Sequence, residues 1–441
     1  MRVYKPSGIE WLMEIPQSWE IKPLQAIFNQ RNEQNNNLEF QTILSLVKDV
    51  GVIPYEEKGN VGNKAKDDLQ GYKIARVNDL VLNKMNAVIG SLGVSKYDGL
   101  VSPIYLVLYI ENPNYLIAYY SYLFQTKSIQ KFLRKFAYGI MEIRESIDYL
   151  EFKKMFLPTP PLQKQKEIAE FLDKKCEKIQ NYINKKQKLI TLLQEKKQAL
   201  INEVVTKGLN PNIEFKNSGI AYLGLIPHHW EVKKLKYVGK VVLGKMLCNE
   251  HQKGYSHCYY LKSKNLQWLN VEVSQIEKMW FSEYEKSLYR IKKDDLLVSE
   301  GGEVGKTCIW NNELAECYIQ NSVHKITLNK FNNAKFFLYL FFTYGKLGVF
   351  DSVVSRVSIA HLVLEKLVNV DMVVPPLQEQ KQIANFLDEK CEKINSAIEK
   401  TKKQIELVKE YKNTLINEAV CGRVACSRDF SPTAQNDKKK N

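Results

Sequence analysis

Two long stretches of the chain carry apolar residues at alternating steps of four and three. The first pattern runs from Ile168 to Val204 and the second from Ile383 to Ala419, with nine of eleven positions apolar in each. A narrow apolar seam sustained over this length is typical of a coiled coil rather than of a helix lying on a sheet. The pattern predicts two long helices, and each copy is the natural partner for the seam of the other.

A Pro-Pro pair precedes each seam and indicates where the helix begins, because proline is accepted in the first turn and not beyond it. The segments that start at Pro160 and Pro375 agree at 16 of their first twenty positions, at an offset of 215. About 45 residues at ~1.5 Å each predict a helix of roughly 65 Å. Polar residues occupy the same two seam positions of both copies: Lys186, Lys197, Thr401 and Lys412. We interpret them as positions that set the register.

A short opening element is also repeated. Residues 8–20 and 219–231 correspond at an offset of 211, and both contain the pattern Ile-Pro-x-x-Trp. We expect Trp19 and Trp230 to be packing anchors rather than platforms for stacked bases. The chain therefore consists of two halves, each with an opening element and a closing helix.

The segments between opening element and helix diverge in sequence but keep a common order. Residues 72–82 and 289–298 both predict a strand, an Asn/Asp-Asp turn and a buried strand. Later strands (104–110 and 323–328) and an aromatic-rich helix (115–124 and 336–342) follow in each half. Each half is thus predicted to be an α/β (α+β) module of about 150 residues, whose helix aromatics pack on the sheet. The predicted division is module one at 1–158, helix one at 159–207, module two at 208–374, helix two at 375–421 and a disordered tail at 422–441.

The net charge of +15 over 441 residues gives a first indication of the kind of partner that the chain binds. The two helical segments, 160–206 and 375–420, account for only +4, so +11 lies in the modules and the tail. Basic modules favour a polyanionic partner, with a merely soluble basic protein as the alternative. The longest apolar run has seven residues, far from the roughly 18 that span a bilayer, and residues 1–14 contain no apolar signal core. We therefore expect a cytoplasmic protein without a membrane partner.

Several local patterns resemble catalytic or metal sites without fulfilling their requirements. Residues 301–307 resemble a phosphate-binding loop, but Glu300 stands where the first glycine is needed, and no helix pattern follows. Residues 159–162, Thr-Pro-Pro-Leu, lack the amide and the aromatic with which amino-methyltransferases hold a flipped base. The acidic pairs 67–68 and 294–295 fall at polar turns. A cluster of Cys248, His251, His257 and Cys258 lacks paired zinc-ligand spacing. We expect no catalytic centre, no metal and no cofactor.

Two diverged modules, two near-identical helices that begin Pro-Pro-Leu-Gln-x-Gln-x-x-Ile-Ala-x-Phe-Leu-Asp, and the Ile-Pro-x-x-Trp element together resemble the specificity subunit of type I restriction-modification systems. The resemblance covers residues 8–421. It implies that the diverged modules are target recognition domains, whereas the repeated helices bind modification subunits. It also implies that the helices pair antiparallel, with a pseudo-twofold internal repeat.

By this resemblance, each module reads one half of a bipartite, asymmetric site on double-stranded DNA. The chain itself would have no activity: two copies of a modification subunit would methylate adenine, and ATP-dependent restriction subunits would translocate and cleave. Loop Lys and Arg would hold phosphates, while Asn, Gln, Arg and Ser would read base edges.

Candidate DNA contacts lie on the loops after the turn-flanked strands and just before each long helix: Asn83, Lys84, Asn86, Arg144, Lys306, Asn321, His324 and Arg356. Candidate partner contacts lie at the duplicated helix starts: Gln163, Gln165, Gln378 and Gln380. Helix capping explains these glutamines almost as well. Two other function classes remain open: a stand-alone DNA-modifying enzyme, which needs a donor or metal site, and a coiled-coil scaffold that binds only proteins.

Overall fold

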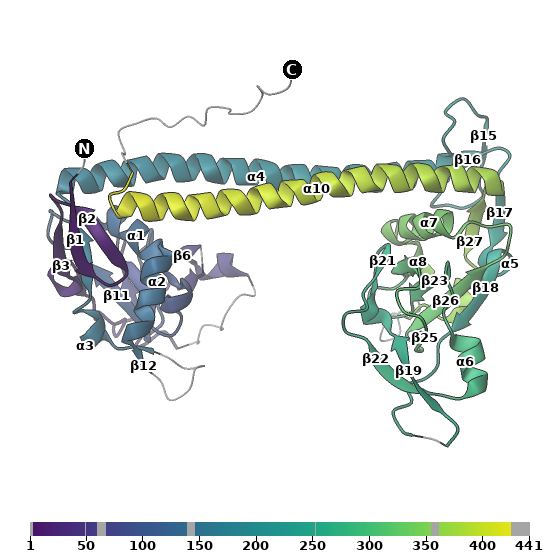
Figure 1. Cartoon of the computed structure of the whole chain (residues 1–441), viewed down its shortest axis with the longest axis horizontal. Helices are drawn as coiled ribbons and strands as arrows, with labels where there is room; N and C mark the ends of the chain where they lie inside the picture. Colours follow the sequence, from purple (N-terminus) through teal and green to yellow (C-terminus); the bar gives the residue numbers. More distant parts are fainter. Residues whose placement is uncertain are drawn as a thin grey trace. The chain divides into compact units, whose positions relative to one another are not determined.

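The structure is a computed structural model that describes residues 3–48, 50–59, 68–138, 146–251, 253–353 and 361–424. The chain divides into two compact units, Met1–Lys186 with Lys403–Asn441 and Gln187–Lys402. Each unit combines one module with one part of both long helices (Figure 1).

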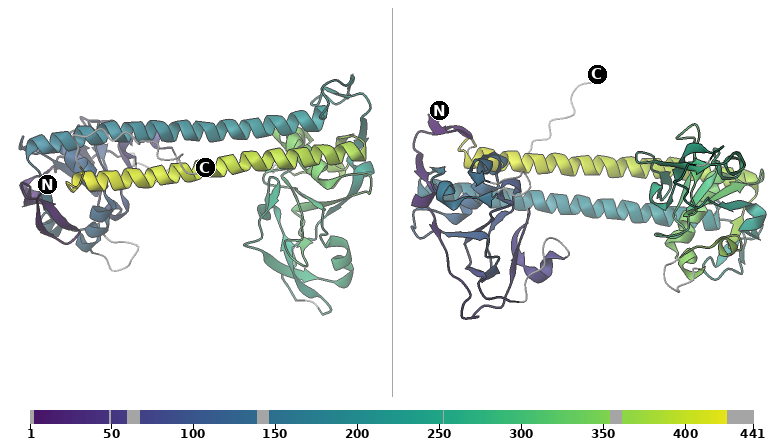
Figure 2. Two further views of the ribbon diagram at one scale, coloured as in Figure 1. Left: turned by 45° about the horizontal axis from the view of Figure 1, so that its top comes forward. Right: turned by 90° about the horizontal axis from the view of Figure 1, so that it is seen from below.

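The two long helices are α4 (Leu162–Lys207) and α10 (Leu377–Val420). They lie side by side within each unit in all three views (Figures 1 and 2). Lys412 of α10 acts electrostatically on Cys176 of α4 in the first unit, and Lys197 of α4 acts on Cys391 of α10 in the second. Since a late position of each helix meets an early position of the other, the pair is antiparallel. This confirms the predicted coiled coil with its internal repeat.

The polar seam residues of the second unit are accommodated by local hydrogen bonds. Lys197 Nζ donates to Asn395 Oδ1 at 2.9 Å, across the helix pair. Thr401 Oγ1 donates to the carbonyl of Ala397 one turn earlier, at 2.7 Å. Side chains satisfied in this way can occupy a seam without leaving a buried polar group unpaired, as a register-setting position requires.

The first module is built from small antiparallel sheets around one four-stranded sheet of order β4-β11-β8-β9. The strands of this sheet are β4 (Asn29–Gln30), β8 (Leu80–Asn83), β9 (Leu92–Val94) and β11 (Tyr105–Tyr109). The other strands pair as β1 (Tyr4–Ile9) with β2 (Leu12–Pro16), β3 (Glu20–Pro23) with β14 (Phe156–Thr159), β5 (Leu44–Val47) with β6 (Gly51–Pro54), β7 (Lys73–Ala75) with β10 (Gly99–Val101), and β12 (Ala137–Tyr138) with β13 (Ser146–Ile147). Its helices are α1 (Ile117–Gln125), α2 (Lys127–Leu133) and α3 (Tyr149–Phe152), with short 3-10 turns η1 (Leu24–Ala26), η2 (Tyr55–Lys58), η3 (Ala87–Ile89) and η4 (Arg134–Phe136).

The second module repeats this plan with a four-stranded sheet of order β18-β26-β23-β24. The strands of this sheet are β18 (Gly239–Leu243), β23 (Leu296–Ser299), β24 (Thr307–Ile309) and β26 (Val323–Leu328). The other strands pair as β15 (Phe215–Asn217) with β16 (Leu225–Pro227), β17 (Glu231–Lys234) with β27 (Asp371–Val374), β20 (Leu266–Gln267) with β21 (Asn270–Val271), and β19 (Ser256–Leu261) with both β22 (Glu277–Phe281) and β25 (Tyr318–Ile319). Its helices are α5 (Leu235–Val238), α6 (Glu283–Tyr289), α7 (Ala334–Lys346), α8 (Val349–Val353) and α9 (Leu364–Leu367), with one 3-10 turn, η5 (Ser263–Asn265).

The turns before β8 and β23 correspond in detail. Asn78 and Asp294 both have positive φ, 70° and 68°, as the predicted Asn/Asp-Asp turns require. The next residue, Asp79 or Asp295, is buried and accepts a backbone N–H three residues back, at 2.8 Å in the first module and 2.7 Å in the second. Burial raises the pKa of Asp295. One expectation in this region is wrong, because residues 289–293 form no strand. Helix α6, opened by a capping box at Ser282, occupies the chain as far as Tyr289.

The core of each unit joins its sheet to its long helices. Trp19 and Trp230 are buried at 2% and 0% exposure, and their rings meet Tyr119 and Phe336 edge to face. The prediction that these tryptophans are packing anchors is confirmed. The aromatic residues of α7 and all those of α1 except the half-buried Tyr122 are buried, in agreement with the prediction. None of the helices in the described ranges combines the length and apolar character needed to cross a membrane.

Candidate nucleic-acid and partner interface

Each long helix is fastened to its module by a buried glutamine. Gln165 and Gln380 are both fully buried. Gln165 Nε2 donates to the carbonyls of Pro160 (2.8 Å) and Asn114 (3.1 Å), and its Oε1 accepts the N–H of Leu116 (2.7 Å). The second joint repeats this arrangement around Gln380.

Gln380 Nε2 donates to the carbonyl of Pro375 (2.8 Å) and to Asn332 Oδ1 (3.3 Å), and its Oε1 accepts the N–H of Asn333 (2.8 Å). The side-chain amides of Gln165 and Gln380 therefore make their hydrogen bonds within the chain. This corrects the expectation of partner contacts for Gln165 and Gln380, since their side chains offer no surface to a second protein. Gln163 and Gln378, two residues earlier, are exposed at the same helix starts and stay candidates.

A tyrosine and an aspartate form a second duplicated contact at each joint. Tyr122 Oη donates to Asp173 Oδ1 at 2.6 Å, and Tyr339 Oη donates to Asp388 Oδ1 at 2.8 Å. Burial, and then the hydrogen bond to the carboxylate, raise the pKa of both phenols far above the usual value. Lys335 also pairs with Asp388. This contact was not predicted from the sequence, although Tyr122, Asp173 and their counterparts recur at offsets of 217 and 215.

In the first module the candidate DNA residues lie on the turn that leaves β8. Asn83 is only 9% exposed, and its Oδ1 accepts the N–H of Met85 at 3.1 Å. Lys84 is half-buried, whereas Asn86 is exposed beside the exposed side chain of Met85. Asn83 therefore shapes the turn, and Lys84 and Asn86 are the members of this set that present side chains to solvent.

In the second module the corresponding loop joins β23 to β24. Lys306 forms an ion pair with Glu303 at 3.0 Å and is 17% exposed. Asn321 is half-buried on the turn before β26, where its side-chain Oδ1 accepts a hydrogen bond from Gln320 Nε2. The structure brings Lys306 and Asn321 to the same end of the four-stranded sheet, because β23, β24 and β26 are neighbours there.

His324 departs from its expected place on a loop. It lies within β26, is 0% exposed, and its Nε2 is 2.6 Å from the carbonyl oxygen of Leu362. Burial lowers the pKa of the ring, so the neutral form is favoured. This burial corrects the expectation of a base contact, because the folded chain leaves no surface of the ring open. Two further candidates, Arg144 and Arg356, lie outside the described residues.

Two antiparallel strands of the second module, β19 and β22, supply an aromatic and basic surface that was not predicted as a site from the sequence. His257 of β19 stacks on Trp280 of β22, with ring centroids 4.7 Å apart. Two residues along, Lys278 Nζ lies 4.4 Å from the ring centroid of the exposed Tyr259. The signal was present in the alternation of 256–261 and 277–281, which places these four side chains on one face. Stacking rings and ammonium groups suit contacts to bases and phosphates.

The patterns that resembled catalytic sites fold as ordinary loops and strands. Residues 301–306 form bends and turns that lead into strand β24 rather than a helix, so no helix N-terminus is available for phosphate. Asp294 and Asp295 belong to the turn before β23. Within the described ranges, no group of three or more His, Cys, Asp or Glu is arranged to hold a metal ion.

The chain matches the family model described as the type I restriction modification DNA specificity domain twice, over residues 16–194 and 227–407. Two diverged sheet modules fastened to a duplicated helix pair define the class, a DNA-recognition subunit. The chain belongs to the type I restriction-modification specificity family, and the resemblance noted in the sequence is confirmed.

Relatives and solved structures agree with this assignment. A protein assigned as the type I restriction enzyme MjaX specificity subunit of Methanocaldococcus jannaschii is 26% identical over 430 residues, covering 93% of this chain and 95% of the relative. The MjaVIII specificity subunit of the same organism is 25% identical over 291 residues, 63% of this chain and 64% of the relative.

A chain from a structure of a type I R-M system, reported for complex assembly and conformational transition, has a TM-score of 0.71 at 14% identity, covering 93% of this chain and 99% of that one. The HsdS subunit of Thermoanaerobacter tengcongensis has a TM-score of 0.52 at 15% identity, with 93% and 98% covered. At these identities the structures support the fold.

Proposed function

We propose that the two modules read the two halves of one bipartite, asymmetric site on double-stranded DNA. The observation that carries the proposal is the contrast between joints and modules. The joints repeat the hydrogen bond from a buried glutamine to the carbonyl of a proline, as Gln165 and Gln380 show, whereas the module surfaces diverge. Identical joints suit identical partner proteins, and divergent surfaces suit two different DNA half-sites.

The side chains proposed to meet DNA are those that keep at least part of their surface open to solvent. In the first module these are Lys84 and Asn86 on the turn after β8. In the second they are Lys306, Asn321 and the face of the β19–β22 strand pair that carries Tyr259, Lys278 and Trp280. Lysines contribute affinity through phosphates, whereas asparagines can read adenine edges bidentately. The net charge of +15 supports a polyanionic partner.

The chemistry is assigned to partner proteins rather than to this chain. Modification subunits, two copies by the repeat, would dock on the duplicated helix starts, where Gln163 and Gln378 are exposed. They would methylate adenine, and ATP-dependent restriction subunits would add translocation and cleavage. The chain would determine only where these enzymes act.

Mapping of methylated adenines tests the proposal directly. The full chain is co-expressed with a modification subunit of this class, and the genome is sequenced by a method that reports N6-methyladenine. One bipartite motif should appear only when both proteins are present. A chain whose residues 1–158 are replaced by the module of a relative should change one half of the motif and preserve the other.

Two other outcomes of this experiment would contradict the proposal. A stable complex without methylation would contradict the recognition role and favour a scaffold that binds only proteins. Methylation by the purified chain without a partner would contradict the absence of catalysis. A modification subunit with a catalytic substitution serves as the matched control, because it keeps the complex and removes the chemistry.

A further inference from the structure

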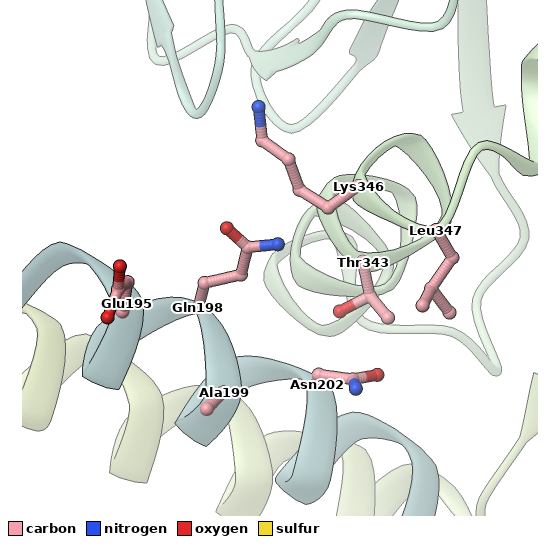
Figure 3. Close-up of a pocket in the computed structure, with 7 residues that line it drawn as sticks. All are labelled: Glu195, Gln198, Ala199, Asn202, Thr343, Lys346 and Leu347. Carbon is pink, nitrogen blue, oxygen red and sulfur yellow. The ribbon is translucent and has the colours of Figure 1, made fainter.

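A pocket of about 290 Å³ lies between α4 and α7 in the second unit. Figure 3 shows side chains of both charges in its lining, the carboxylate of Glu195 and the ammonium of Lys346. A lining of mixed charge selects no single class of ligand, so the pocket defines no new site. A more specific arrangement lies in the second module, where one buried lysine connects two of the elements proposed to bind DNA.

This lysine is Lys245, which follows β18 and is 9% exposed. Its Nζ donates to Glu285 Oε2 at 2.6 Å and to the carbonyl of Trp280 at 2.9 Å. The same Nζ lies 4.8 and 5.4 Å from the ring centroids of Tyr255 and Phe281. A carboxylate, a carbonyl and two aromatic faces replace the hydration that the buried ammonium loses, and they hold it in one position.

Glu285 is the acceptor that keeps this ammonium paired. It lies in the first turn of α6, where its carboxylate also accepts the backbone N–H of Ser282 at 2.8 Å in a capping box. Burial alone would raise the pKa of Glu285, but the hydrogen bonds from Lys245 and Ser282 hold this pKa below its ordinary value. The carboxylate is therefore ionised at neutral pH and ties Lys245 to the capped end of a helix.

The side chain of Lys245 also fixes the backbone of Trp280 in β22. The carbonyl of Trp280 accepts from Lys245, and its N–H donates to the carbonyl of Cys248 at 3.0 Å. Both backbone polar groups of Trp280 are thus bound by the segment 245–248. The indole stacks on His257 of β19, so the placement of this exposed pair of rings depends on Lys245.

The backbone of Lys245 holds a second element, the turn that carries Asn321. The N–H of Lys245 donates to the carbonyl of Ile319 at 3.1 Å, and its carbonyl accepts the N–H of Asn321 at 2.8 Å. The preceding glycine permits this close approach, since a Cβ on Gly244 would collide with the backbone of Gln320. One residue therefore joins β22 to the turn before β26.

We propose that Lys245 is a positioning residue for recognition of a DNA half-site by the second module. The inference rests on the proposed function, in which Trp280 and Asn321 meet DNA. Lys245 exposes too little surface to read a base, and it acts by holding these two residues in a fixed arrangement. Figure 1 shows β19 and β22 at the end of the second module away from α4 and α10, so this role is separate from the proposed docking of partner proteins on the helices.

Fluorine NMR of the full chain labelled with fluorotryptophan tests the positioning of Trp280 without DNA. W280F identifies the Trp280 signal by its loss. K245M keeps a long side chain but removes the donors, and it should shift or broaden the Trp280 signal. The signal of Trp310, a core residue of the same module that is 1% exposed, should not change.

K325M is the matched control for this measurement. Lys325 is 7% exposed in the same module, but its Nζ donates to the carbonyls of Leu288 and Arg290 at the end of α6, at 2.9 and 2.7 Å. K325M should lower the melting temperature of the chain, because it removes hydrogen bonds of a buried lysine. It should leave the Trp280 signal in place.

DNA binding by the complex with modification subunits tests the effect on recognition. The half-site of the second module is the one preserved when residues 1–158 are exchanged. In wild type, a base-pair substitution in either half should weaken binding about 5- to 150-fold. In K245M this penalty should nearly disappear in the half-site of the second module and remain in the other half. A variant that only lost folded protein would weaken all DNAs alike and keep both penalties.

An unchanged Trp280 signal in K245M, or unchanged penalties in both halves, would overturn the positioning role while leaving the proposed function intact. A loss of both penalties would also overturn it, because the effect would not be local. A wild-type complex without a penalty in either half would refute the proposed function and the positioning role together.

E285Q keeps the test decisive if K245M does not fold. Glutamine can still accept the N–H of Ser282, but it removes the charge that holds the ammonium of Lys245. E285Q should therefore reduce the penalty in the half-site of the second module to a smaller extent than K245M and spare the other half. Equal penalties in E285Q and wild type would overturn the positioning role.

Discussion

At the scale of single residues, His324 shows how burial turns a candidate contact into a structural group. Its Nε2 faces the carbonyl of Leu362, while its Nδ1 is buried without a hydrogen-bond partner. Burial lowers the pKa of the ring, which favours the neutral form with Nε2 as the donor. Protonation would place a charge beside apolar neighbours of the central strand β26.

This burial predicts a pH-dependent stability. The folded pKa is lowered from 6.5, so the unfolded state binds a proton first as the pH falls. The contribution of His324 is complete above the unfolded pKa and is lost as the pH falls from about 6.5 toward the folded pKa. The slope approaches ~1.4 kcal/mol per pH unit in that window. Urea unfolding of wild type and H324Q between pH 5 and 8 checks this.

H324Q is the matched variant because glutamine can donate to the Leu362 carbonyl without titrating. The difference in unfolding free energy between the two proteins should be constant above pH 7 and should shrink or reverse below 6.5. Parallel profiles across the whole range would show that His324 is protonated or solvated in the folded chain.

The positions of some of these residues could be predicted from the sequence, and those of others could not. The tryptophan anchors were predictable because Trp19 and Trp230 recur within an identical pattern. His324 was misplaced because the first four residues of β26, Val323–Ile326, are all buried, polar ones included, and this burial is set by the tertiary packing of the module. Gln165 was misread because its burial depends on a loop at Asn114, fifty-one residues away in sequence. Contacts of that kind are set by tertiary packing.

At the scale of elements, each unit contains a joint between a module helix and a long helix: α1 with α4 in the first unit and α7 with α10 in the second. The phenol of Tyr339 connects α7 to α10 through Asp388, and the phenol of Tyr122 connects α1 to α4 through Asp173. The helix starts were predictable from the Pro-Pro pairs, since α4 and α10 begin at Leu162 and Leu377. The joints were not, because their members lie about fifty residues apart in sequence.

Removal of one phenol should loosen one joint. Y339F deletes the hydrogen bond to a carboxylate that also holds Lys335, and we expect a loss of about 1–2 kcal/mol. Hydrogen exchange in α7 and in the first turns of α10 should accelerate about 5- to 30-fold. Y284F, which alters a tyrosine that is 76% exposed, is the control. Exchange that accelerates equally in the first module would argue against a local joint.

The coiled-coil seam makes a prediction of its own. Lys197 is half-buried and bonds Asn395 across the helices, an arrangement that fixes register at a cost in stability. K197L should raise the melting temperature of the chain by a few degrees, about 1 kcal/mol, whereas K196L on the exposed neighbouring position should not. A lower melting temperature for K197L would show that the Lys197 hydrogen bond outweighs apolar burial.

At the scale of the whole molecule, sequence and structure divide the chain into repeated and diverged parts. The repeated parts are the opening elements, the joints and the helices, and the two helical segments, 160–206 and 375–420, carry only +4 of the net charge of +15. The modules carry the rest together with the tail. Since the modules hold most of the basic residues, electrostatic attraction to DNA should originate in them, and the helices should contribute protein contacts.

Salt dependence separates phosphate contacts from base contacts in the assembled complex. For DNA carrying the target site, the logarithm of the association constant should fall linearly with that of the salt concentration, by about 0.9 for each phosphate neutralised. K84A should reduce this slope by about one and weaken target and unrelated DNA alike. N86A should leave the slope unchanged and weaken target DNA about 5- to 100-fold, because it removes a base contact. If both variants changed neither slope nor affinity, the turn after β8 would face away from DNA, and another surface of the first module would have to read the half-site.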